Sequence, residues 1–170
     1  MPRSATCSPG RYRDRWPSAS NLTGRRLEAA VKRVVVAELP AAVADTHALL
    51  FHAAASGVLG RRAAAHFAAC ERQQAIVYVP AAVVWETSLL ARVSRVNLRR
   101  TVREFFVDLF TNPAYHPYNL SLDEVYLADE LRFTRDPFDA LICAAARTLE
   151  VPLLTRDADI RASGSVRVVW

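Results

Sequence analysis

The stretch RDPFDALICAAARTLEVPLLTRD, residues 135–157, decides the fold class of this chain. Asp136 directly before Pro137 is the order of a helix N-cap and a first-turn proline, so a helix is predicted over residues 138–150. The run PLLT at residues 152–155 follows at once and is typical of a short buried strand. A helix that leads directly into a buried strand is the unit from which parallel α/β sheets are built.

The same alternation of strands and helices continues upstream and downstream of this stretch. Strands are predicted at residues 41–44 (AAVA), 75–79 (AIVYV), 118–120 and 166–170. Helices are predicted at residues 59–73, 81–93, 99–110 and 123–131. Ser121 and Glu124 form a capping box at the start of the last of these helices. We therefore predict an α/β fold, a three-layer α/β/α sandwich with a central, mainly parallel sheet.

The composition is that of one globular domain. The chain has 170 residues, of which 52% are hydrophobic and 23% are charged. It contains no run of about eighteen apolar residues and no apolar signal core in its first thirty residues, so we expect a cytoplasmic protein with no membrane partner. Cys7, Cys70 and Cys143 are far apart and form no CxxC pair, so free thiols are predicted.

The net charge of +5 is concentrated near the amino terminus. Residues 1–37 hold eight of the 22 basic and two of the 17 acidic residues, which leaves 14 basic and 15 acidic groups in residues 38–170. We predict that residues 1–37 form a basic, disordered extension and that residues 38–170 form the folded domain. The nearly neutral charge of that domain does not by itself indicate a nucleic-acid-binding protein.

Four acidic side chains are predicted to meet at one edge of the sheet. Asp45 and Asp157 follow the carboxyl ends of predicted strands, where open parallel sheets bind their ligands. Asp139 lies in the first turn of one predicted helix, and Glu86 lies about two turns into another. Carboxylate oxygens match magnesium, with manganese as the alternative. A bound ion of this kind can orient a phosphodiester and activate water, so metal-assisted phosphodiester hydrolysis is the predicted chemistry.

Four further polar residues near these acids have two interpretations each. Asp136 either caps its helix or joins the metal site, and Asp159 either lies in a surface loop or reaches the metal through water. Thr155 either supports an acidic ligand by a hydrogen bond or is only a buried strand residue. For His47 we favour a structural or packing role over contact with the substrate.

A cluster of arginines spans the end of one predicted helix and the start of the next. Its side chains could contact phosphate groups or could form a solvated helical surface. The members are Arg92, Arg95, Arg99, Arg100 and Arg103. Trp85, Phe105 and Phe106 are predicted to lie in the core or at a dimer interface.

Four segments resemble, in order and at suitable spacing, the acidic motifs of PIN-domain toxins of the VapC type. They are ADTHALLF (44–51), VVWE (83–86), RDPFDALICAAA (135–146) and LLTRDADI (153–160). The resemblance covers roughly residues 40–170. One departure is Ala140, which stands where family members often have an arginine after the third acid.

This resemblance implies a PIN-like fold and an Mg²⁺-dependent endoribonuclease acting on cellular RNA. It places the family's catalytic and metal-binding quartet at Asp45, Glu86, Asp139 and Asp157. It also implies a VapB-like antitoxin as protein partner and a homodimer as the oligomeric state. On this basis residues 38–170 are expected to be a PIN-like nuclease domain.

Two other functions remain open, and three are excluded. A non-catalytic PIN-like module that binds RNA or protein, and a host RNA-processing PIN nuclease without an antitoxin, both fit the same motifs. A haloacid-dehalogenase-like phosphatase would need an aspartate at the position of His47. A response-regulator receiver would need a lysine near its site, but Lys32 is the only lysine, and a P-loop protein would need a glycine-rich turn with lysine.

Overall fold

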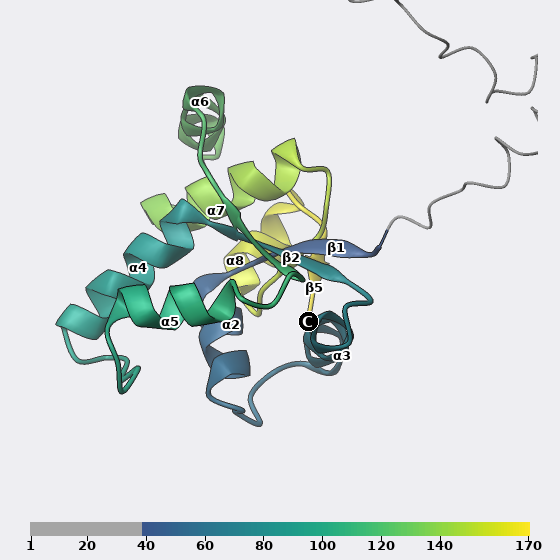
Figure 1. The fold of residues 1–170 in the computed structure, drawn as a ribbon. Coiled ribbons are helices and arrows are strands. Elements are labelled where there is room, and N and C mark those ends of the chain that lie inside the picture. Colours follow the sequence, from purple (N-terminus) through teal and green to yellow (C-terminus); the bar gives the residue numbers. More distant parts are fainter. Residues whose placement is uncertain (1–38) are drawn as a thin grey trace, which may run out of the picture. The chain divides into compact units, whose positions relative to one another are not determined.

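Five short parallel strands form the centre of the computed structural model, which describes residues 39–170 (Figure 1). They are β1 (Ala41–Ala44), β2 (Ile76–Pro80), β3 (Tyr115–Tyr118), β4 (Leu153–Leu154) and β5 (Val168–Val169). Their order across the sheet is β3-β2-β1-β4-β5, and every neighbouring pair is parallel. The predicted α/β fold with a mainly parallel sheet is confirmed.

Seven helices connect these strands within residues 39–170. They are α2 (Thr46–Ala53), α3 (Arg61–Glu71), α4 (Ala81–Arg92), α5 (Val102–Leu109), α6 (Leu122–Glu130), α7 (Pro137–Thr148) and α8 (Ala158–Ser163). In Figure 1, α7 lies on one side of the sheet and α2 and α3 lie on the other. Helix α4 packs against both α2 and α7, which brings three different helices together beside the sheet.

The core is built around β1, the middle strand. Ala42, Val43 and Ala44 have no exposed surface, because a central parallel strand is covered on both faces. Helix α7 contributes Ile142 and Cys143 to the same core. Burying a side chain the size of isoleucine stabilises the fold by about 1.5–3 kcal/mol. The unit that decided the fold class in the sequence is therefore also part of the centre of the core.

The predicted helix starts are found in the structure. The Asp136 carboxylate accepts a hydrogen bond from the backbone N–H of Phe138 at 2.8 Å, with Pro137 in the first turn of α7. Ser121 and Glu124 form the predicted capping box of α6.

The structure shifts one predicted strand and contains two helices that were not predicted. The strand expected at residues 118–120 is β3, three residues earlier, and it contains Pro117, which an edge strand tolerates because one of its sides has no partner. Helix α2 was not predicted, because its apolar and polar residues are not separated onto two faces as in an amphipathic helix. Helix α8 was not predicted because it has only six residues.

Other predictions concern the whole chain. Cys70 and Cys143 are buried free thiols. Within residues 39–170, no helix has the length and apolar character needed to span a bilayer. The predicted basic extension over residues 1–37 lies outside the described residues, and so does Cys7.

Candidate functional site

The candidate site begins where the strand order reverses, at the carboxyl ends of β1 and β4. The register pairs Ala44 with Leu154, so the following residues, Asp45 and Thr155, stand side by side. The backbone N–H of Asp45 donates to the Leu154 carbonyl at 3.1 Å, which extends the pairing by one residue. Such reversal points are where open α/β sheets bind their ligands.

Asp45 is fixed by Thr155. The Thr155 hydroxyl donates to Oδ2 of Asp45 at 2.7 Å, and the backbone N–H of Asp157 donates to the same hydroxyl oxygen at 3.1 Å. Thr155 is fully buried, so both interpretations of this residue hold: it is buried and it supports an acid. Asp45 is only 6% exposed, and burial raises its pKa while the Thr155 hydrogen bond opposes that rise.

Asp157 is the N-cap of α8. Its Oδ1 accepts hydrogen bonds from the backbone N–H groups of Asp159 at 2.9 Å and Ile160 at 2.8 Å. Its Oδ2 has no hydrogen-bond partner among residues 39–170. One carboxylate oxygen is therefore used by the fold, and the other is free to bind a ligand.

Asp139 lies in the first turn of α7, next to the other acids. Its Oδ2 accepts a hydrogen bond from the Thr134 hydroxyl at 3.3 Å. Burial, followed by the charges of Asp136, Asp45 and Asp157, raises its pKa to about 7. These carboxylates are close enough to repel one another, although they lie at the starts of three different helices, α2, α7 and α8.

Glu86 completes the group from α4. Burial raises its pKa, and the charges of Asp45 and Asp136 raise it further. The hydroxyl of Thr46 lies near Glu86 and lowers its pKa, which opposes this rise. This buried hydroxyl has no partner within 3.5 Å in the described residues, so its contact with Glu86 is longer than a normal hydrogen bond. Asp45 thus lies within range of the charges of both Glu86 and Asp139, and Asp157 lies within range of Asp139.

Asp136 and Asp159 differ in their relation to this group. Asp136 caps α7, as predicted, and its charge also raises the pKa of both Asp139 and Glu86. Asp159 is exposed and is not among the groups that raise the pKa of these acids. Asp136 therefore lies beside the acidic site. Asp159 is connected to the site through the hydrogen bond from its backbone N–H to Asp157.

The donor set fits a hard divalent cation. Within the described residues, no group of three or more histidine, cysteine or acidic side chains is arranged so that it could by itself hold a metal ion. Magnesium, however, keeps several of its waters and is usually held by only one or two carboxylates. An open group of oxygen donors matches that requirement. A cation would offset the negative charges that, after burial, raise the pKa values of Glu86 and Asp139.

Sequence reasoning missed or misplaced several residues around the acids. His47 is exposed, so it is not packed in the core, while a structural role for it stays a prediction, and its charge lowers the pKa of Asp45. Arg156 was not singled out, although it stands between Thr155 and Asp157 in a quoted motif, and its guanidinium lies over the ring of Phe51 at 4.9 Å.

The predictions for the aromatic residues and arginines beyond the site are confirmed only in part. Phe105 and Phe106 are buried in the core, as predicted, but Trp85 is 50% exposed, so a core position is wrong for it. Arg92 lies over the Trp85 ring at 5.0 Å. Arg100 forms an exposed ion pair with Asp108 at 2.8 Å. Phosphate binding and a solvated surface both stay predictions for this cluster of arginines.

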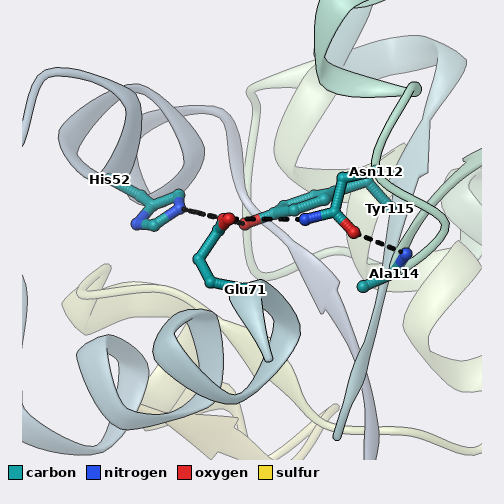
Figure 2. A network of polar contacts seen from close by, with 5 residues as sticks. All are labelled: His52, Glu71, Asn112, Ala114 and Tyr115. Carbon is teal, nitrogen blue, oxygen red and sulfur yellow. Dashed lines mark hydrogen bonds and ion pairs between the residues drawn. The ribbon is translucent and has the colours of Figure 1, made fainter. Parts of the chain in front are cut away.

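A second polar cluster lies at the opposite edge of the sheet (Figure 2). The Tyr115 hydroxyl donates to Oε1 of Glu71 at 2.6 Å, and His52 Nε2 lies 3.2 Å from the same oxygen. Asn112 donates to the other oxygen of Glu71 at 3.3 Å. These hydrogen bonds, that of Tyr115 first, lower the pKa of Glu71. Because Tyr115 opens β3, this cluster ties helices to the amino end of the sheet.

Solved structures with a similar fold are toxin–antitoxin proteins. A toxin–antitoxin complex from Klebsiella pneumoniae is 22% identical, with a TM-score of 0.50, covering 76% of this chain and 96% of that one. VapBC2 from Rickettsia felis, bound to a promoter DNA fragment, is 14% identical with a TM-score of 0.53, covering 76% and 97%. VapC20 from Mycobacterium tuberculosis, a toxin that cleaves the sarcin–ricin loop, is 21% identical with a TM-score of 0.54, covering 74% and 98%.

These identities are low, so the three structures establish the similarity of the fold alone. No curated protein matches the chain. The sequence model of the PIN domain matches residues 42–164, a range that begins in β1, ends just after α8 and includes all four acids. With this match over most of the sequence and the same fold in the solved structures, the chain belongs to the PIN domain family.

Proposed function

We propose that this protein is an endoribonuclease that requires Mg²⁺, with Mn²⁺ as the alternative, and that it is the toxin of a type II toxin–antitoxin system. The observation that carries the proposal is the convergence of Asp45, Glu86, Asp139 and Asp157 at the carboxyl edge of the sheet. Four acids from separate segments, partly desolvated and mutually repelling, are costly unless a cation offsets their charge.

Three of the acids would contribute to binding such an ion in different ways. Asp45 is oriented by Thr155, so one carboxylate keeps a fixed position without a ligand. Asp157 offers its free Oδ2. Asp139, with a pKa of about 7, holds a proton part of the time near neutral pH and would release it to become a ligand. A bound ion would orient the scissile phosphodiester and lower the pKa of an attacking water.

The assignment to RNA and to an antitoxin partner rests on the family and on the similar structures. Those from Klebsiella pneumoniae and Rickettsia felis are toxin–antitoxin proteins, and the one from Mycobacterium tuberculosis is a toxin that cleaves an RNA loop. By this likeness we propose a VapB-like antitoxin, a homodimer and a cytoplasmic site of action, with residues 38–170 as the nuclease domain.

The central test is cleavage of a fluorescently labelled structured RNA with and without Mg²⁺. We expect wild-type protein to cleave the RNA with Mg²⁺ and to stop in EDTA. Asp45→Asn should abolish cleavage while the protein stays folded, because asparagine can still accept the Thr155 hydrogen bond. Asp129→Asn is the matched control, since Asp129 is exposed and, among residues 39–170, its one ion pair is with Arg132 at 3.1 Å.

Each alternative function predicts a different result. Binding of the RNA without any metal-dependent cleavage would indicate the non-catalytic module instead of the enzyme. Cleavage by a protein whose expression does not slow bacterial growth would indicate a processing nuclease. Toxicity that a small protein encoded by the neighbouring gene relieves, in a complex with this chain, is the result expected for the toxin.

A further inference from the structure

We propose that Arg156, supported by the ring of Phe51, binds an RNA phosphate next to the scissile one and guides the strand across α2 into the acidic site. This inference rests on the proposed function, and it names a substrate-binding residue outside the four acids of the site. Three observations carry it: the position of the Arg156 backbone, the freedom of its guanidinium, and the character of the adjacent α2 surface.

The backbone of Arg156 is fixed within one residue of the site on both sides. Thr155 donates its hydroxyl hydrogen bond to Asp45, and the Asp157 N–H donates back to the Thr155 hydroxyl. The Arg156 carbonyl also accepts a hydrogen bond from Arg161 at 3.3 Å. The side chain therefore leaves from a rigid point at the rim of the acidic group.

The guanidinium of Arg156 is not used by the fold. The residue is exposed, and no carboxylate among residues 39–170 lies within 4.0 Å of its charge, although several acids are nearby. Instead the guanidinium lies over the Phe51 ring, with Cζ 4.9 Å from the ring centroid. Contact with a ring orients the guanidinium but forms no hydrogen bond, so its N–H donors remain available to a phosphate.

Helix α2 continues this surface toward the acids. His47 is exposed one turn before Phe51, and the two ring centroids are 6.2 Å apart. His47 also lies close enough to Asp45 and Glu86 for its charge to lower their pKa. A strand that follows α2 would thus meet Arg156 and two aromatic rings before the carboxylates, which suits single-stranded RNA with its accessible phosphates and base faces.

A fixed positive charge is needed here for a physical reason. The four carboxylates repel the negatively charged RNA, and one bound cation does not fully offset their charge. The net charge of residues 38–170 is close to zero, so the rest of the domain does not attract RNA either. Each phosphate that a basic side chain neutralises on a single strand contributes about 0.7 to the slope of log affinity against log salt concentration. The proposed contact therefore has a measurable signature separate from cleavage.

The experiment measures binding of a fluorescent single-stranded RNA by fluorescence anisotropy over a range of salt concentrations. All proteins carry Asp45→Asn, so that no RNA is cleaved. Adding Arg156→Gln should weaken binding by about tenfold and lower the salt slope by about 0.7. Arg156→Lys should restore the slope but only part of the affinity, because a lysine cannot make the same forked contact.

Arg147→Gln is the matched control, because Arg147 is exposed in the last turn of α7, the end of that helix away from Asp139. It should leave both affinity and slope unchanged. Equal salt slopes for Arg156→Gln and Arg147→Gln would overturn the inference.

Cleavage kinetics separate this inference from the proposed function. With Asp45 intact, Arg156→Gln should raise KM for RNA and change kcat little, since the lost contact is made away from the reacting phosphorus. If wild-type protein cleaves RNA and Arg156→Gln has an unchanged KM, the inference is wrong and the proposed function stands. If wild-type protein neither binds nor cleaves RNA in Mg²⁺, both are wrong.

Discussion

Thr155 is the residue on which the position of Asp45 depends most directly, because its buried hydroxyl joins Asp45 to the backbone of Asp157. We predict that Thr155→Val, which keeps the shape and removes the hydroxyl, will destabilise the protein by about 1–3 kcal/mol through unpaired buried polar groups. It should also reduce RNA cleavage strongly. Chemical denaturation and cleavage rates test this, with Thr155→Ser as the control that retains the hydroxyl.

Asp139 gives the metal-free protein a characteristic pH dependence. Its pKa is raised in the folded state from 3.8 to about 7, so folding favours the protonated form. The stability associated with this group is complete at pH values below its unfolded pKa and is lost as the pH rises through about 7. In EDTA, the melting temperature of wild-type protein should therefore fall over this range.

The matched variant for this pH dependence is Asp139→Asn, which has no proton to lose at that position. Its melting temperature should change less than that of wild type over the same pH range. If the two proteins lose stability in parallel, Asp139 is not the responsible group.

The positions of the acidic residues could be predicted from the sequence, because each stands at a fixed distance from a strand end or helix start. Asp45 directly follows β1, and Asp139 lies in the first turn of α7, three residues after its cap. The directions of His47 and Arg156 could not be predicted in this way. Where a long or exposed side chain points depends on neighbours from other elements, here the Phe51 ring for Arg156.

At the scale of elements, the cluster of His52, Glu71, Asn112 and Tyr115 joins α2, α3 and β3 (Figure 2). We predict that Tyr115→Phe will lower the free energy of unfolding by about 0.5–1.5 kcal/mol, the usual contribution of one hydrogen bond. RNA cleavage by the folded protein should be unchanged. A large loss of activity without unfolding would contradict the structural role that we give this cluster.

Elements with a clear local signal were predictable, and those that depend on tertiary contacts were not. Helix α7 has a cap, a first-turn proline and a buried alanine-rich face, all of which agree. Helix α2 has an apolar sequence that reads equally well as a buried strand, and only its packing against α3 and α4 makes it a helix. Strand β3 was misplaced because Pro117 argues locally against a strand.

At the scale of the whole molecule, metal binding should stabilise the fold because the unfolded chain has no assembled site. A ligand at a concentration of one hundred times its Kd contributes about 2.7 kcal/mol to the free energy of unfolding. We predict that millimolar Mg²⁺ or Mn²⁺ will raise the melting temperature of wild-type protein by several degrees. Asp45→Asn should show a smaller rise, and an unchanged wild-type melting temperature would count against the metal site.

The hydrogen bond between Thr155 and Asp45 joins residues 110 positions apart, and the two strands that lead to it are neighbours in the sheet. A ribosome that adds about 5–20 residues per second needs roughly 5–20 s to synthesise the segment between them. Throughout that interval the emerging polypeptide holds Asp45 but not the partner that orients it. Nascent chains on the ribosome are thus expected to be inert toward RNA, including the RNA of the ribosome that makes them.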